Sequence, residues 1–265
     1  MAGLLLLVIA YNHNSNTIYN FSGQAYGTTW SISSSEYIAD NHKDEIKNII
    51  NKIDLIASNY KPESEISQIN INYSEYQFIS DDLFKILEIA KVVELSTDGY
   101  YNIMLGKISS NLGFAPDFGQ NTFQNKASTF DIDETNKSLK RYSKNWFDLS
   151  SIAKGYAVQE IHNYLISNNL MNHVIDIGGE IIINGNKDGI PWNIGIQNPL
   201  SSVDNAATTI SNKNNNFLAI ATSGEYRNFK LDEYGNKVTH TINPKTLSSI
   251  KNKILSVTVV NEYSA

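Results

Sequence analysis

The chain has 265 residues, 41% of them hydrophobic, and a formal net charge of −6. Such a chain can bury a substantial core, and its acidic balance argues against a nucleic-acid partner, which would require a basic surface. Cysteine is absent. This excludes disulfides, thiolate metal sites and a thiol nucleophile, so any metal must be held by oxygen or histidine ligands, which favours Mg²⁺ over Zn²⁺.

The N-terminus begins with an apolar stretch, residues 1–10, that is too short to span a bilayer but suits the hydrophobic part of an export signal. The stretch lacks the basic residues that usually precede the hydrophobic part of a signal. The alternative interpretation of residues 1–10 is a buried first strand in a chain whose start is mistaken or trimmed. Tyr11 stands where a lipoprotein would carry its lipid-bearing cysteine. We expect residues 1–16 to be a signal or anchor with its linker, and residues 17–265 to be one domain. The expected location is extracytoplasmic, on the periplasmic side of the inner membrane.

Hydrophobic periodicity predicts the first elements. Alternating apolar residues predict two strands within residues 17–34. Apolar residues at spacings of three and four predict helices over residues 42–58, 80–95 and 150–168. Ser80 is the predicted N-cap of the second helix.

Strands dominate the later part of the chain. Alternation predicts them at residues 173–177, 180–184, 192–196 and 255–259. The Ser/Asn-rich residues 201–216 are predicted to form a surface loop, and the polar residues 111–145 give no assignment. Helices early and strands late indicate an α+β fold, with mixed or antiparallel sheets and packed helices, rather than a regular βαβ alternation.

The first segment whose residues could bind a ligand or take part in catalysis is D-L-S-S-I-A-K-G-Y-A, residues 148–157. An acid and two hydroxyls precede the predicted helix, and Lys154 lies in its first turn. A helix N-terminus suits a phosphate, and Asp148 could orient a ligand group or a hydrated Mg²⁺. Taken alone, these residues also describe a capped amphipathic helix. A Walker-type loop is excluded because the GxxxxGK pattern fails.

Two more segments follow. In D-I-G-G-E, residues 176–180, the paired glycines permit a close backbone approach to a ligand, or form a plain turn. A-T-S-G-E-Y-R, residues 221–227, leads to H-T-I-N-P, residues 240–244. Their hydroxyls, arginine and histidine could surround a phosphate and supply a base, although a histidine beside a proline turn is often merely structural.

These segments, in this order, resemble the ApbE family of FAD:protein FMN transferases. The family pattern is similar to D-L-G-G-I-A-K-G-Y-A, a G-G-D/E strand pair, P-W-x-V-G-I-Q-x-P, A-x-A-T-S-G-D/E-Y-R and H-I-I-D-P. The counterparts here are residues 148–157, 178–180, 191–199, 219–227 and 240–244. Two earlier pieces also match, Y-G-T-T-W at residues 26–30 and S-N-Y-K-P-E-S-E-I-S at residues 58–67.

The resemblance implies an ApbE-like, T-fold-like architecture and a Mg²⁺-dependent transfer of FMN from FAD to a threonine or serine hydroxyl of a target flavoprotein, with release of AMP. The target could be a subunit of a membrane redox complex. By the same resemblance, His240 is the base, Asp148 is the second catalytic residue, and Ser151 is a metal ligand through its carbonyl. The implied FAD-binding residues are Tyr26, Gly27, Thr28, Tyr60, Tyr100, Tyr101, Asn102, Asp148, Lys154, Glu180, Ser223, Gly224 and Arg227.

Three departures from the family pattern bear on activity. Y-Y-N at residues 100–102 replaces a stretch like A-F-D, Asn243 replaces an aspartate, and Leu247 replaces a glycine. In the family, an Asp and a Thr or Ser that complete the Mg²⁺ site lie beyond the position of Ala265. We therefore expect weak or no transferase activity from this chain.

Two other functions stay open. An FAD pyrophosphatase would use the same metal site with water as the acceptor, and a non-catalytic protein would store or sense FAD. The resemblance also implies that FAD binds better than FMN, because the family's site grips the adenine half, for which Tyr60 is a natural stacking partner.

Overall fold

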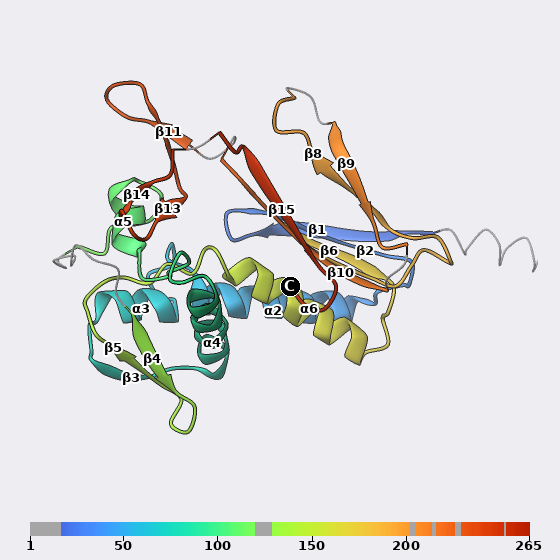
Figure 1. Cartoon of the computed structure of the whole chain (residues 1–265). Coiled ribbons are helices and arrows are strands. Elements are labelled where there is room, and N and C mark those ends of the chain that lie inside the picture. Colours follow the sequence, from blue (N-terminus) through green and yellow to red (C-terminus); the bar gives the residue numbers. More distant parts are fainter. Residues whose placement is uncertain (1–16, 120–128, 202–204, 214–215, 226–228, 252) are drawn as a thin grey trace, which may run out of the picture. The chain divides into compact units, whose positions relative to one another are not determined.

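The computed structural model describes residues 17–119, 129–201, 205–213, 216–225, 229–251 and 253–265 (Figure 1). These residues form two compact units. Unit 1 comprises the described residues up to Ile50 together with Lys154–Ser223 and Ser256–Ala265, and unit 2 comprises Asn51–Ala153 and Gly224–Leu255. The chain crosses between the units within helix α2 (Asp40–Ala57), at the start of helix α6 (Ala153–Ser167), after Ser223 and after Leu255.

Unit 1 is built on a six-stranded sheet with the order β1-β2-β6-β7-β10-β15 (Figure 1). Its strands are β1 (Tyr19–Ala25), β2 (Thr28–Ser34), β6 (His173–Ile177), β7 (Glu180–Asn184), β10 (Phe217–Gly224) and β15 (Ser256–Asn261). Neighbouring strands from β1 to β10 pair antiparallel. The predicted hairpins around Gly27 and around the Gly178–Gly179 pair are confirmed.

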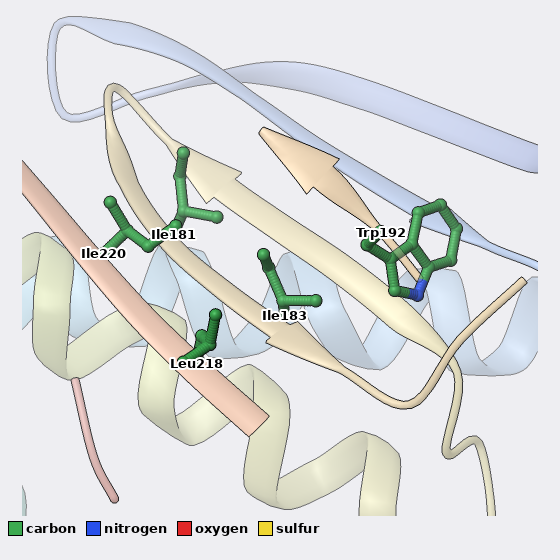
Figure 2. Packing of buried hydrophobic residues seen from close by; sticks show 5 residues of the cluster. All are labelled: Ile181, Ile183, Trp192, Leu218 and Ile220. Carbon is green, nitrogen blue, oxygen red and sulfur yellow. The ribbon is translucent and has the colours of Figure 1, made fainter. Parts of the chain in front are cut away.

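One face of this sheet carries an apolar cluster. Its buried members are Ile181, Ile183, Trp192, Leu218 and Ile220 (Figure 2). The register of β7 and β10 places Ile181 opposite Ile220, and Ile183 opposite Leu218. Trp192 directly precedes β8 (Asn193–Gln197), which forms a hairpin with β9 (Ala206–Ser211).

The other face of the sheet packs on α6. His173, Ile175 and Ile177 alternate along β6 and are fully buried, so they share one face. His162 of α6 contacts this face, where its Nδ1 lies 3.0 Å from Nε2 of His173. Helix α6 confirms the predicted third helix, and its residues Ala157, Ile161 and Leu165 are buried, as their spacing predicts.

Unit 2 combines short helices with small antiparallel sheets. Its helices are α3 (Glu65–Ile71), α4 (Asp81–Ser96) and α5 (Gly106–Asn111). One sheet has the order β3-β5-β4, formed by Tyr76–Phe78, Ser138–Arg141 and Phe130–Asp133. Two hairpins follow, β11 (Phe229–Leu231) with β12 (Lys237–Thr239), and β13 (Ile242–Asn243) with β14 (Ser248–Ser249). Ser80 is the N-cap of α4, as predicted, and its Oγ accepts from the Leu83 N–H at 3.2 Å.

A buried arginine ties the core of unit 2 together. Arg141 has no exposed surface, and its two terminal nitrogens donate to the carbonyls of Ile69 and Asn145, each at 2.6 Å. Its guanidinium also lies 5.3 Å from the ring of Phe147. Burial lowers the pKa of Arg141 to about 10, so the side chain stays charged at neutral pH.

Two regions differ from their sequence predictions. Residues 201–216 were expected to form a loop, but β9 lies within them and pairs with β8. The β-branched residues Thr208, Thr209 and Ile210 favour a strand. The composition of residues 201–216 as a whole does not show this, because Asn and Ser residues flank the short run. The unassigned residues 111–145 contain β4 and β5.

In the part of the chain that the structure describes, none of the helices is both long and apolar enough to cross a membrane. Residues 1–16 lie outside the described residues, so the signal or anchor expected there stays a prediction.

Candidate functional site

The predicted site residues are distributed over both units. Unit 2 contains Tyr60, Tyr100, Tyr101, Asn102, Asp148, Ser151, Gly224 and His240, whereas unit 1 contains Tyr26, Gly27, Thr28, Lys154, Glu180 and Ser223. Arg227 lies outside the described residues. Within unit 2, Tyr101 contacts Ser151, and within unit 1, Lys154 contacts Glu180.

In unit 2, Asp148 begins a tight turn that leads into α6. Its Oδ1 accepts from the Ser150 N–H at 3.0 Å, and the carbonyl of buried Leu149 accepts from the N–H groups of Ile152 and Ala153. An aspartate that bonds the backbone two residues later is a common turn motif before a helix. The turn leaves Asp148 half-buried and exposes Ser151.

Two tyrosines lie close enough to Asp148 to respond to its charge. Burial raises the pKa of Tyr101, an effect opposed by its hydrogen bond to Ser151 and increased by the negative charge of Asp148. The Tyr101 hydroxyl lies 3.1 Å from Ser151 Oγ. Burial and then the charge of Asp148 also raise the pKa of Tyr60. Both phenols are therefore protonated at neutral pH and can donate hydrogen bonds.

Tyr60 also lines a pocket of about 350 Å³ in unit 2, together with Asn59 and Phe118. Asn59 is almost fully buried and its Nδ2 donates to the Phe147 carbonyl at 2.8 Å. Its Oδ1 is buried and has no hydrogen-bond partner among the described residues. Such an acceptor fits a ligand amino or hydroxyl group. Sequence reasoning did not select Asn59, although it lies within the quoted S-N-Y-K-P motif.

Phe114 joins Tyr60 to His240. The Tyr60 hydroxyl donates to the Phe114 carbonyl at 2.6 Å. The ring of Phe114 meets the His240 imidazole in an edge arrangement, with centroids 6.1 Å apart. His240 directly follows β12, whose last residue, Thr239, is buried and accepts from Ser249 at its backbone carbonyl. Tyr60, the predicted partner of adenine, and His240, the predicted base, thus both contact Phe114. The sequence analysis did not identify Phe114 as a site residue.

The side chains of residues 100–102 have different surroundings. Tyr100 is exposed, and the Lys245 ammonium lies 5.4 Å from the centre of its ring. Asn102 donates from Nδ2 to Glu94 and accepts from the Met104 N–H at Oδ1. These bonds give Asn102 a structural role in unit 2, and its contact with FAD stays a prediction.

In unit 1, Lys154 and Glu180 form an ion pair. Lys154 Nζ lies 2.6 Å from Glu180 Oε1. Glu180 Oε2 is buried without a hydrogen-bond partner among the described residues, so it is an acceptor that a ligand hydroxyl would satisfy. Asp176, which was not in the predicted set, accepts from the Gly179 N–H at 2.9 Å. Burial raises the pKa of Asp176, while that hydrogen bond and Lys154 oppose the rise.

Two glycine turns shape this part of unit 1. Gly178 has a φ of +60°, and a Cβ there would lie 2.6 Å from Thr28 Cγ2, so only glycine fits. Tyr26 and Gly27 form the two-residue loop between β1 and β2, both with positive φ, as a type I′ turn requires. The Tyr26 hydroxyl donates to the Ile50 carbonyl at 2.8 Å, which anchors the loop to α2. Ser223 is exposed near the end of β10.

The turn at Asp148 has suitable donors for Mg²⁺. The Asp148 carboxylate and the carbonyl of exposed Ser151 are hard oxygen ligands, the kind that Mg²⁺ prefers. No group of three or more His, Asp or Glu side chains with metal-binding geometry occurs in the described ranges. The turn can therefore contribute one carboxylate and one carbonyl to a site that uses other oxygens as well.

Comparison with known proteins decides the family. Residues 26–265 match the ApbE family. The chain belongs to the ApbE family. An FAD:protein FMN transferase of Vibrio cholerae is 30% identical over 97% of this chain and 80% of its own length. One from Haemophilus influenzae is 29% identical over 98% and 81%.

Solved structures support the same assignment. The flavin transferase ApbE from Vibrio cholerae superposes on this ApbE-family chain with a TM-score of 0.76 and 26% identity, covering 93% of this chain and 82% of that one. The ApbE protein from Thermotoga maritima gives a TM-score of 0.79 at 22% identity, over 93% and 82% of the two chains, which shows the shared fold. The α+β, ApbE-like fold expected from the sequence is confirmed.

Proposed function

We propose that this ApbE-family enzyme transfers FMN from FAD to a threonine or serine hydroxyl of a target protein and releases AMP. The transferase activity is supported by the relatives named above, which match along most of this chain. The Mg²⁺ requirement, the type of acceptor residue and the released AMP follow from the resemblance of its motifs to the family pattern.

The observation that carries the proposal is the link from Tyr60 through Phe114 to His240. Tyr60 borders a pocket that is also lined by Asn59, whose buried oxygen has no hydrogen-bond partner among the described residues and would suit the amino group of an adenine ring. His240 contacts the ring of Phe114, whose carbonyl accepts a hydrogen bond from Tyr60. A base for the acceptor hydroxyl is therefore held within the same unit as the adenine pocket.

The reaction is a displacement at the flavin-side phosphorus. The acceptor oxygen forms a bond to that phosphorus, the bond to the AMP oxygen breaks, and His240 accepts the hydroxyl proton. The Asp148 carboxylate and the Ser151 carbonyl would hold Mg²⁺, which would supply positive charge against the pyrophosphate. In unit 1, Lys154 pairs with Glu180, whose second carboxylate oxygen has no partner among the described residues and would fit a ligand hydroxyl.

We also propose that the enzyme acts on the periplasmic side of the inner membrane, on a flavoprotein such as a redox complex subunit. This rests on the apolar residues 1–10, which suit an export signal. Fractionation of cells that express the full natural chain would test the location. Recovery in the cytoplasmic fraction would contradict it.

The test of the activity mixes the protein with FAD and an acceptor protein, with Mg²⁺ or with a chelator. The proposal predicts AMP and covalently bound flavin in the Mg²⁺ reaction alone. AMP with free FMN and no labelled acceptor would instead identify an FAD pyrophosphatase. Tight FAD binding without any AMP would identify a protein that stores or senses FAD.

A further inference from the structure

His240 lies in the middle of a segment that two lysines fasten to the rest of unit 2. We define the His240 segment as residues 229–249, which comprise the hairpins β11–β12 and β13–β14. Lys230 lies in the first hairpin and Lys245 in the second. Each donates a hydrogen bond from its ammonium group to a backbone carbonyl just after a helix.

Lys245 reaches the end of α4. Its Nζ donates to the Asp98 carbonyl at 2.6 Å, across 147 residues of sequence. Asp98 has a φ of +50°, and the Gly99 N–H bonds back to the Glu94 carbonyl at 2.9 Å. This is the bonding pattern of a Schellman motif, in which Asp98 is the first left-handed residue past the helix.

Lys230 makes the same contact at the end of α5. Its Nζ donates to the Gly113 carbonyl. Gly113 has a φ of +79°, and the Phe114 N–H bonds back to the Ser109 carbonyl at 2.8 Å. A Cβ on Gly113 would lie only 2.5 Å from Lys230 Nζ, so a side chain at this position would displace the ammonium group.

The two contacts share a physical basis. Carbonyls at a helix C-terminus carry the negative end of the helix dipole, and a lysine ammonium is favourable there. Each ammonium also lies 5.4 Å from the centre of a ring that follows the turn, Tyr100 for Lys245 and Phe114 for Lys230. Phe114 is the residue that contacts His240 and accepts from Tyr60.

We propose that Lys230 and Lys245 are positioning residues that clamp the His240 segment, and through it His240, onto the C-terminal turns of α5 and α4. The proposal rests on the proposed function, in which His240 takes the proton of the acceptor hydroxyl. Both lysines act through His240 and are not required to touch FAD. Their loss displaces the base but leaves the adenine pocket intact.

The test uses Lys230→Met and Lys245→Met, which keep the length of the side chain and remove its charge. Lys237→Met is the matched control, since Lys237 lies in β12 of the same segment and packs over the Phe229 ring of its own hairpin at 4.7 Å. We expect kcat to fall about 10- to 100-fold in each clamp variant, because displacement of a catalytic group by about 1 Å has effects of this size. KM for FAD should stay within about twofold, and Lys245→Arg should restore most of kcat, since arginine can donate to the same carbonyl.

A second readout does not need activity. Amide hydrogen exchange of residues 241–250, which include the Leu247 N–H bonded to Asn243, should speed up about tenfold or more in Lys245→Met, with the thermal midpoint unchanged. The kinetic variants are made in the full natural chain. If that chain fails to transfer FMN, the proposed function fails, whereas the exchange data still test the clamp. The clamp is overturned if the methionine variants match Lys237→Met in kcat and exchange. It is also overturned if Lys245→Met unfolds and Lys245→Arg, though folded, remains as slow as a variant without His240.

Discussion

Leu247 adopts a positive φ of 55° in the turn that follows His240. A leucine is strained in this conformation by about 1–2 kcal/mol, whereas glycine is not. The glycine that the resemblance implies at this position would avoid that strain. Asn243, the other substitution in this turn, keeps a useful contact, because its Oδ1 accepts from the Lys245 N–H at 2.9 Å.

Replacing Leu247 therefore tests the strain. Leu247→Gly removes both the side chain and the strain, and Leu247→Ala removes the side chain alone. We expect the glycine variant to be more stable than the alanine variant by about 1 kcal/mol in denaturant unfolding, because alanine keeps the penalty of the left-handed conformation. Equal stabilities of the two variants would show that the turn is not strained.

Asp148 has two separable roles. Its Oδ1 fixes the turn before α6 by accepting from Ser150, and its charge is available to a metal. Asp148→Asn keeps the acceptor and removes the charge. We expect it to retain the wild-type thermal midpoint but to lose Mg²⁺-dependent turnover by on the order of 100-fold or more. Asp148→Ala should lose the same activity and, in addition, about 1 kcal/mol of stability. Full activity of the asparagine variant would remove Asp148 from the metal site.

At the scale of elements, α6 and β6 are joined by a buried histidine pair. His173 Nδ1 contacts the Leu170 carbonyl at 2.9 Å, and its Nε2 lies 3.0 Å from His162 Nδ1. Burial lowers the pKa of His162 to about 4 and that of His173 to about 4. His173 donates from Nδ1 to the Leu170 carbonyl and accepts at Nε2 from His162 Nδ1, so one proton on each ring satisfies both contacts and both rings are neutral in the folded state.

This pair predicts acid sensitivity. Histidines in the unfolded chain become protonated near pH 6.5, whereas the folded pair becomes protonated only near pH 4. The pair's contribution is therefore complete above pH 6.5 and is lost as the pH falls from 6.5 to 4, by on the order of 3 kcal/mol for each histidine. Urea unfolding across this range should show the loss, and His162→Phe should flatten it. An equally steep profile in that variant would place the acid-sensitive group elsewhere.

Elements defined by local pattern were predictable from sequence. The hairpin of β6 and β7 was predicted with its observed bounds, because period-two alternation flanks a glycine pair that needs positive φ. Strand β9 was missed because its short β-branched run lies among Asn and Ser residues, and it is stabilised by pairing with β8.

The site residues that the sequence analysis did not identify were missed for the same reason. Phe114, Lys230 and Lys245 acquire their roles from partners 54, 117 and 147 residues away along the chain. No local periodicity reports such contacts, whereas the motif at residues 148–157 was visible because its acid, hydroxyls and helix start lie within ten residues.

At the scale of the whole molecule, a ligand that binds the folded chain and not the unfolded chain stabilises the fold, so FAD should raise the stability of this chain. We expect FAD to raise the thermal midpoint more than equimolar FMN does, because only FAD carries the adenine that fits beside Tyr60. A ligand at 100 times its Kd stabilises by about 2.7 kcal/mol. Tyr60→Ala should weaken FAD binding by about 1–2 kcal/mol, while Tyr60→Phe, which keeps the ring, should lose less. Equal midpoints with FAD and FMN would contradict an adenine site.

The most direct test of the central claim is the ratio of AMP to acceptor-bound flavin in one reaction with FAD, Mg²⁺ and an acceptor protein. If the chain couples cleavage of FAD to attack by the acceptor hydroxyl, the two products appear in a one-to-one ratio. Replacing His240 with Gln should then slow both equally, since His240 takes the acceptor's proton. AMP formed in excess of acceptor-bound flavin, with free FMN making up the difference, would contradict the account.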